Sequence, residues 1–146
     1  MNRTPDPFLQ ILESYKAAVL AKDVEAFLAL YDDEVHVFDL WGVWSLHGIE
    51  AWRSMAVGWF TSVGDERIIV DIAQVGSTRL GELAIGHAFL TYTAMSTDGT
   101  ALRSLDNRIT AALRKVEGVW KIFHEHTSVP IEHISAKAML QREGGG

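Results

Sequence analysis

Apolar residues in the N-terminal third of the chain recur every three or four positions, which is the period of an amphipathic helix. The first such stretch follows Asp6-Pro7, an N-cap residue and a proline at the first helical position, and a second follows Asp23. A third extends from Ile49 to about Val63. The pattern therefore predicts three helices, each with an apolar face that must be buried against another layer.

After Gly64-Asp65 the apolar residues alternate with polar ones, which is typical of β-strands. This alternation predicts four long strands, at residues 67–75, 83–95, 100–116 and 119–129. The same pattern over residues 35–40 predicts one short strand before the third helix. The connections at 96–99 and 117–118 contain glycine and are short enough for hairpins, so the long strands should form an antiparallel meander. Residues 131–141 are expected to form a terminal helix.

The expected architecture follows from the length of these strands. Long strands in a small domain twist and curl, and helices that cover the concave face of a curled sheet enclose a conical space. We therefore expect one α+β domain over residues 1–146, in which three N-terminal helices wrap a cone-shaped, curved antiparallel or mixed sheet around an apolar pocket. The core should span about residues 7–130, with a C-terminal tail at 131–146. Apolar side chains such as Phe123 on the outer sheet face predict a homodimer through that face.

Composition excludes several classes of function. The formal net charge is −6 and the 13 Lys and Arg residues are dispersed, so nucleic acid is not an expected partner. Because there is no apolar run near the ~18 residues of a membrane span, and no apolar signal segment at the N-terminus, we expect a cytoplasmic protein without membrane contact. Cysteine is absent, which excludes disulfides and a cysteine nucleophile.

Four of the five tryptophans fall between residues 41 and 59. They form either an aromatic core or the wall of a pocket for an apolar, ring-shaped molecule. The second interpretation predicts a set of ligand-binding side chains from this region and from the later strands: Trp41, Trp44, Trp52, Met55, Trp59, His87, Phe89 and Trp120.

Asp39 is the clearest candidate for acid–base chemistry. It shares a strand face with Val35 and Val37, so its carboxyl group should face the apolar pocket, where burial raises a carboxyl pKa and suits a general base. The alternative is that the strand ends before Asp39, which then caps the turn at Gly42. Tyr15 lies on the apolar stripe of the first helix, where its hydroxyl would bond either a substrate carbonyl or a backbone carbonyl.

The last two strands carry further candidates. His124 and His126 are spaced to share one strand face with Ile122, so both are expected to line the pocket as acid or base, or else to bond neighbouring strands. Arg108 would stabilise an oxyanion, or pair with an acidic residue. The His-x-His spacing supplies only two ligands of a metal site, and the third would be one of three residues elsewhere: His87, Asp39 or Asp106. We expect no metal and no organic cofactor.

Three strings in the chain carry a family resemblance: AKDVEAFLALYDDEVHVFDLWG, HGIEAWRSM and EGVWKIFHEHTSVP. Together they resemble the superfamily of nuclear transport factor 2, ketosteroid isomerase and the SnoaL-like polyketide cyclases, over nearly the whole chain. The last string is most similar to SnoaL-like proteins of unassigned activity. The resemblance implies the nuclear transport factor 2-like, cystatin-like fold, which hosts both enzymes and non-catalytic binders.

Within that superfamily, ketosteroid isomerases use an aspartate base with a tyrosine and a protonated aspartate as oxyanion donors. The resemblance implies that Asp39 matches the base and Tyr15 the tyrosine, whereas the third position falls on Thr110 or Ala111, neither of which is acidic. The implied function is a pocket that binds a small apolar molecule bearing a carbonyl group and moves a proton beside it without a cofactor, as an isomerase, cyclase or dehydratase. The alternative is a non-catalytic ligand-binding or dimerising module of the same fold.

Overall fold

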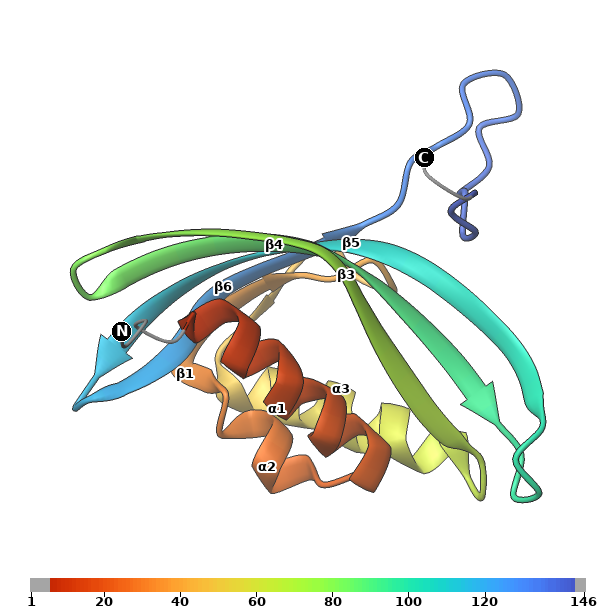
Figure 1. The fold of residues 1–146 in the computed structure, drawn as a ribbon, viewed down its shortest axis with the longest axis horizontal. Coiled ribbons are helices and arrows are strands. Elements are labelled where there is room, and N and C mark those ends of the chain that lie inside the picture. The colour runs from red at the N-terminus through yellow and green to blue at the C-terminus, as the bar shows by residue number, and fades with distance from the viewer. Residues whose placement is uncertain (1–5, 144–146) are drawn as a thin grey trace, which may run out of the picture.

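A curved sheet of six strands lies over three helices in the computed structural model, which describes residues 6–143 (Figure 1). The helices are α1 (Pro7–Ala21), α2 (Val24–Leu28) and α3 (Ile49–Val63). The strands are β1 (Tyr31–Phe38), β2 (Leu46–His47), β3 (Arg67–Leu80), β4 (Leu83–Met95), β5 (Ala101–Val116) and β6 (Val119–Ser128). Their order in the sheet is β2-β1-β6-β5-β4-β3, with β1 and β6 parallel and the other neighbours antiparallel. The expected α+β architecture with a mixed, curved sheet is therefore confirmed.

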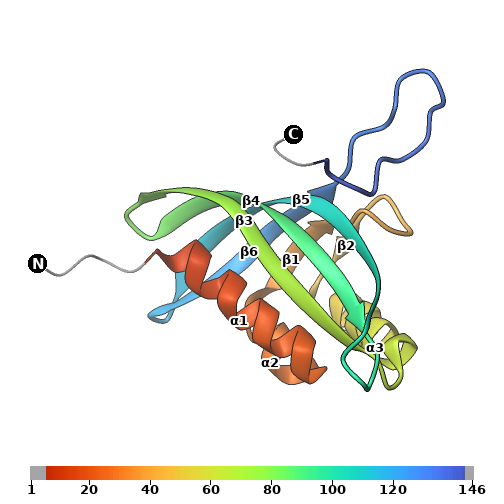
Figure 2. The same cartoon turned by 45° about the vertical axis from the view of Figure 1, so that its right-hand side comes forward.

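The first helix forms where the sequence places its start signal. The Asp6 side chain accepts hydrogen bonds from the backbone amides of Phe8 at 2.9 Å and Leu9 at 3.3 Å, which satisfies two donors that the first helical turn leaves free. Phe8 is fully buried because β4 has Gly86 at the point of contact: a Cβ atom there would lie 2.2 Å from the Phe8 ring. Helix α1 thus lies tightly against the concave face of the sheet (Figure 2).

The third strand is longer than its sequence pattern indicates. We expected a strand at 67–75 and a link after it, but β3 continues to Leu80. The pairing of β3 with β4 slips between Ala73 and Gly76, and Gln74 takes a positive φ of 52° there. This bulge breaks the alternation of side chains while the strand itself goes on. Gly76 is needed beyond the bulge, because a Cβ atom would lie 2.7 Å from the His87 ring on β4.

Two other expectations about the elements are wrong. Strand β1 spans Tyr31–Phe38 instead of the expected 35–40, so the polar residues 32–34 belong to the strand. The terminal helix at 131–141 does not form: residues 130–139 make an irregular hairpin with a bridge between Ile131 and Ala138. The Glu132 carboxylate accepts bonds from the Ser135 amide and hydroxyl, a local turn that competes with helix formation. Ile134 is 85% exposed, so a helix here would have no layer against which to bury its apolar face.

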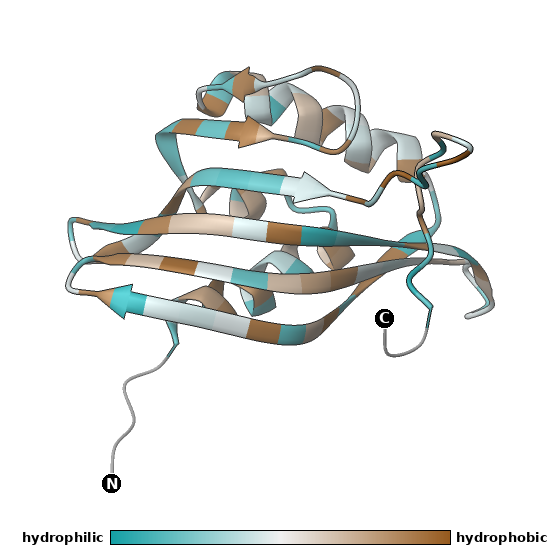
Figure 3. Cartoon of the chain, turned by 90° about the horizontal axis from the view of Figure 1, so that it is seen from above, coloured by the Kyte–Doolittle hydropathy of each residue, from teal (hydrophilic) through white to brown (hydrophobic). Residues whose placement is uncertain are grey.

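The sheet has two unlike faces. Its concave face and the three helices enclose the apolar core, whereas its convex face is open and carries apolar patches between polar ones (Figure 3). Among the exposed apolar side chains on that convex face are those of Phe38, Leu83, Ile85 and Leu102. The C-terminal segment leaves β6 and extends on the convex side, away from the helices (Figures 1 and 2). Of the helices formed by residues 6–143, none combines the length and the apolar character that crossing a membrane requires.

Candidate functional site

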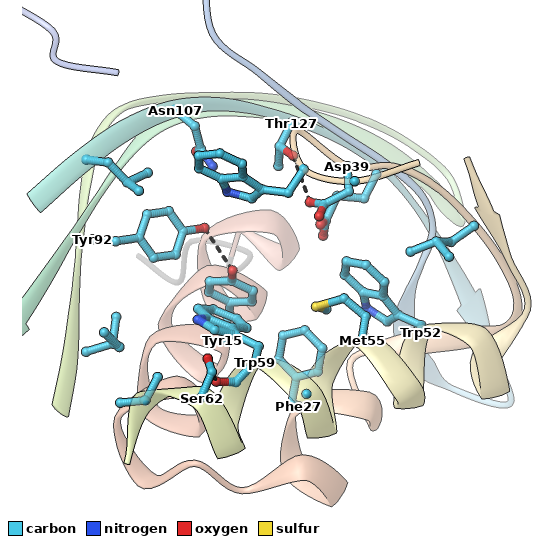
Figure 4. A pocket seen from close by; sticks show the side chains of 18 of the residues that line it. Tyr15, Phe27, Asp39, Trp52, Met55, Trp59, Ser62, Tyr92, Asn107 and Thr127 are labelled. Atoms are coloured by element: carbon cyan, nitrogen blue, oxygen red, sulfur yellow. Dashed lines mark hydrogen bonds between the residues drawn. The ribbon is translucent and has the colours of Figure 1, made fainter. Parts of the chain in front are cut away.

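A cavity of about 930 Å³ lies between the concave sheet face and the helices. Its size is in the range of sites that hold small organic molecules, about 300–1,000 Å³. Figure 4 shows that side chains from the sheet converge on it from one side and those from the helices from the other. Most of the lining is aromatic or aliphatic, with a few polar groups; it includes Tyr15, Phe27, Asp39, Trp41, Trp52, Met55, Trp59, Tyr92, Asn107, Glu125 and Thr127.

Asp39 lies just beyond the last residue of β1 and its side chain lines the cavity (Figure 4). Its carboxylate accepts a hydrogen bond from the Thr127 hydroxyl at 3.1 Å, and that hydroxyl accepts one from the Leu40 amide at 2.9 Å. Strand β1 therefore ends before Asp39, as the alternative interpretation predicted, but the Asp39 side chain still faces the cavity. Burial raises the pKa of Asp39, so the carboxyl holds a proton more readily than an exposed aspartate does.

Glu125 is a second carboxyl group in the same cavity wall and is only 2% exposed. It accepts a hydrogen bond from the Tyr31 hydroxyl at 2.6 Å. Burial raises the pKa of Glu125 to about 7, and the negative charge of Asp39 acts in the same direction. A carboxyl group with that pKa exchanges its proton near neutral pH, which is the property of a general acid or base.

Two tyrosine hydroxyl groups meet across the cavity. The Tyr15 and Tyr92 oxygens are 2.8 Å apart, joining α1 to β4 (Figure 4). Burial raises the pKa of both phenols above the usual range, so both remain protonated at neutral pH. In such a pair one hydroxyl donates to the other, and the second keeps a proton for another acceptor, for example the carbonyl oxygen of a bound molecule.

The predicted pocket position of His124 and His126 is wrong, because β6 contains a bulge. Leu113 on β5 pairs with Ile122, but the next residue, Ala112, pairs with His124. The extra residue reverses the alternation, so that Ile122 is followed on the inner face by Glu125 and Thr127, which the sequence did not single out. His124 Nδ1 instead lies 2.8 Å from the His36 carbonyl oxygen, and both histidine rings pack against Phe38 on the outer face.

Arg108 is also on the outer face. The inner face of β5 is formed by Asn107 and its odd-numbered neighbours, so Arg108 points away from the cavity and its Nε donates to the Ser128 hydroxyl at 3.1 Å. The same alternation places His87 and Phe89 of β4 outside the cavity. None of these three side chains can contact a molecule in the pocket.

The tryptophans divide into two groups. Trp41, Trp52 and Trp59 line the cavity, as does Met55. Trp44 is 97% exposed on the loop before β2, and Trp120 lies outside the cavity. The guanidinium group of Arg79 and the ammonium group of Lys115 contact the Trp120 ring there, at 5.1 and 5.8 Å from its centroid. Trp44 and Trp120 thus do not take the ligand-binding position that the sequence predicted for them.

Aromatic side chains pack against one another on the helix side of the cavity. Phe27 lies at the centre of this group, with the rings of Tyr31, Tyr15 and Phe60 at centroid distances of 5.2, 5.6 and 5.7 Å. Such contacts add stability beyond the burial of apolar area and fix ring orientations.

The structure does not assemble the metal site that the His-x-His spacing left open. Asp39 lies on the cavity side and the His-x-His pair on the other side of the sheet, so they cannot share a metal ion. Within residues 6–143 there is no group of three or more metal-ligating side chains.

Residues 9–132 match a family model described as the SnoaL-like domain. Among solved structures, a nuclear transport factor 2-like protein of unknown function from Pseudomonas putida superposes with a TM-score of 0.82 and 23% identity, covering 93% of each chain. A protein with a cystatin-like fold from Novosphingobium aromaticivorans gives 0.74 and 15%, covering 93% of this chain and 88% of its own. The protein Aln2 from a Streptomyces species gives 0.72 and 16%, covering 86% and 93%. No curated protein matches the chain.

Proposed function

The chain belongs to the SnoaL-like domain family, and on that basis we propose that its cavity binds a small, mostly apolar molecule with a carbonyl group and moves a proton at the carbon beside it. One observation carries the proposal: a carboxyl group and a pair of protonated phenols line the same apolar cavity. Removing a proton beside a carbonyl requires a base and a donor for the developing oxyanion. Asp39 supplies the first and the Tyr15–Tyr92 pair the second.

In the proposed reaction the Asp39 carboxylate takes the proton from the α-carbon, and the electron pair of the C–H bond moves onto the carbonyl oxygen as an enolate. The free hydroxyl proton of the Tyr15–Tyr92 pair stabilises that oxygen. Return of the proton from Asp39 to another carbon of the conjugated system completes an isomerisation, and loss of a leaving group from the enolate completes an elimination. The raised pKa of Asp39 favours capture of the proton from carbon.

The experiment uses 2-tetralone, a bicyclic ketone with acidic protons beside its carbonyl group. Proton–deuterium exchange at that carbon is followed by NMR in heavy water, and affinity is measured by tryptophan fluorescence. We expect wild-type protein to accelerate exchange saturably, and Asp39→Asn to lower the bound-state rate about 100-fold or more with similar affinity. His126→Ala, on the outer sheet face, is the matched control and should leave both quantities unchanged.

Two results would exclude catalysis of this kind. One is saturable binding by wild-type protein with exchange no faster than in buffer; the other is equal exchange by wild-type protein and Asp39→Asn. The first result would favour the second candidate function, a non-catalytic ligand-binding or dimerising module of the same fold; the second would remove Asp39 as the base.

The dimerising role has its own support. Exposed apolar side chains of Leu83 and Ile85, two residues apart on β4, lie on the open convex face, and exposed apolar surface of this kind is typical of protein contacts. We propose a symmetric homodimer through that face. Light scattering coupled to size exclusion should report a dimer for wild-type protein and a monomer for Ile85→Lys. A wild-type monomer at micromolar concentration would exclude it.

A further inference from the structure

The segment 140–142, here called the strap, returns to the sheet after the protruding hairpin 130–139. It docks on β5 at the place where β6 has ended, since Arg108 and Ser128 form the last residue pair of those strands. The Asp106 amide donates to the Leu140 carbonyl at 2.8 Å, and the Gln141 side-chain amide donates to the Ser104 carbonyl at 2.7 Å. The strap therefore takes over the hydrogen bonding of a strand edge that β6 leaves open.

Asp106 binds the strap a second time through its side chain. One carboxylate oxygen accepts a hydrogen bond from the Arg142 backbone amide at 2.6 Å, and the other accepts one from the Thr91 hydroxyl on β4, also at 2.6 Å. The Arg142 guanidinium group lies over the Phe89 ring, 4.6 Å from its centroid. The carboxylate of Asp106 thus joins three segments, and hydrogen bonds to a charged acceptor are stronger than those between neutral groups.

The strap also forms part of the cavity wall. Leu140 and Gln141 line the cavity together with Arg103, Ser104 and Leu105 of β5. The hairpin that precedes the strap closes on itself through its own backbone bonds, such as Glu132 N to Lys137 O at 2.8 Å. Its side chains at 131 and 134 are exposed. The strap is therefore held against the cavity mainly by the contacts at β5 itself.

We propose that Asp106 is a positioning residue for the ligand site: it holds the strap so that Leu140 and Gln141 enclose the bound molecule. This inference rests on the proposed function of the cavity and deepens it. Asp106 itself does not line the cavity. Its effect on a ligand is transmitted by the strap, and removal of its carboxylate frees the Arg142 amide and loosens the wall.

The test uses prodan, a fluorescent naphthalene ketone whose emission shifts to the blue in apolar surroundings. Its dissociation constant and dissociation rate are measured for full-length wild-type protein, Asp106→Ala, the wall variant Leu140→Ala/Gln141→Ala, and the combination of all three substitutions. We expect Asp106→Ala and the wall variant each to weaken binding about tenfold, mainly through faster dissociation. The combined protein should lose no more than the wall variant alone, because both changes act through the same contacts.

Asp71→Ala, an exposed aspartate on β3, is the matched control and should bind prodan like wild-type protein. Asp106→Asn keeps one acceptor oxygen and should bind more tightly than Asp106→Ala. If the two losses multiply to about 100-fold, Asp106 acts independently of the strap and the proposal is overturned. It is also overturned if the wall variant binds normally. If wild-type protein does not bind prodan at all, the proposed function of the cavity fails, and the role of the strap fails with it.

Discussion

Replacing Glu125 by glutamine should stabilise the protein at alkaline pH and have much less effect at acidic pH. The reason is the direction of the pKa shift of this carboxyl group, which burial raises from 4.5 to about 7. A group with a higher pKa in the folded state binds its proton more tightly when folded. The loss of folding stability caused by the Glu125 carboxyl group is therefore absent well below pH 4.5. It grows between pH 4.5 and 7, because the unfolded state releases the proton first, and it reaches its full value above pH 7.

The magnitude follows from the two pKa values. Each pKa unit corresponds to about 1.36 kcal/mol, so the difference between 4.5 and about 7 makes the ionised carboxylate cost about 3 kcal/mol of folding stability. Glutamine is never charged, and its side-chain oxygen can still accept the hydrogen bond from Tyr31. We expect the gain in the free energy of unfolding to be about 2–3 kcal/mol larger at pH 8 than at pH 5.

Urea unfolding followed by circular dichroism at pH 5 and pH 8 gives the free energy of unfolding for both proteins. In thermal melts the larger gain at pH 8 corresponds to a rise in Tm on the order of 5–10 °C. Glu13→Gln removes an exposed carboxylate from α1 and is the matched control, expected to change stability little at either pH. A gain from Glu125→Gln that is the same at pH 5 and pH 8, or is absent, would refute the burial of this carboxyl group in the cavity wall.

Three further substitutions test the scaffold and the polar pair. Gly86→Ala should cost about 1–3 kcal/mol of folding stability in urea unfolding, because the new methyl group would overlap the Phe8 ring; an unchanged midpoint would contradict that packing. Asp6→Ala should cost about 1 kcal/mol in the same assay through loss of the helix cap, and equal stability would show that the cap does not form. Tyr92→Phe should slow 2-tetralone exchange about tenfold or more by disrupting the pair with Tyr15, whereas an unaltered rate would remove the pair from the mechanism.

The helices and the long strands were predictable from the sequence because their signals are local. The cap at Asp6 and the apolar stripe of residues 49–63 depend only on neighbouring residues, and the structure reproduces both. The prediction of a terminal helix at residues 131–141 is wrong for a reason that is not local. The pattern there was helical, but residues 131–139 protrude from the sheet, where no layer of the fold can receive an apolar face.

The site was only partly predictable, because a bulge changes which side chains face the cavity. A single extra residue between Ile122 and His124 exchanges the two faces of β6, and the sequence alternates so regularly there that it gives no sign of the slip. The identity of Glu125 gave no warning either, because a charged residue between two predicted inward positions is expected to face solvent. In the structure its hydrogen-bond partner is Tyr31, the first residue of β1, and the pairing of β1 with β6 brings the two together.

The central claim is that apolar carbonyl compounds bind in the cavity, and the five tryptophans allow a direct test. Indole N–H signals in a proton–nitrogen NMR spectrum, assigned with single Trp→Phe variants, are recorded while prodan is added. The signals of Trp41, Trp52 and Trp59 should shift and saturate together, while those of Trp44 and Trp120 stay in place. Movement confined to Trp44 or Trp120, or no movement at all at saturating prodan, would contradict binding in this cavity.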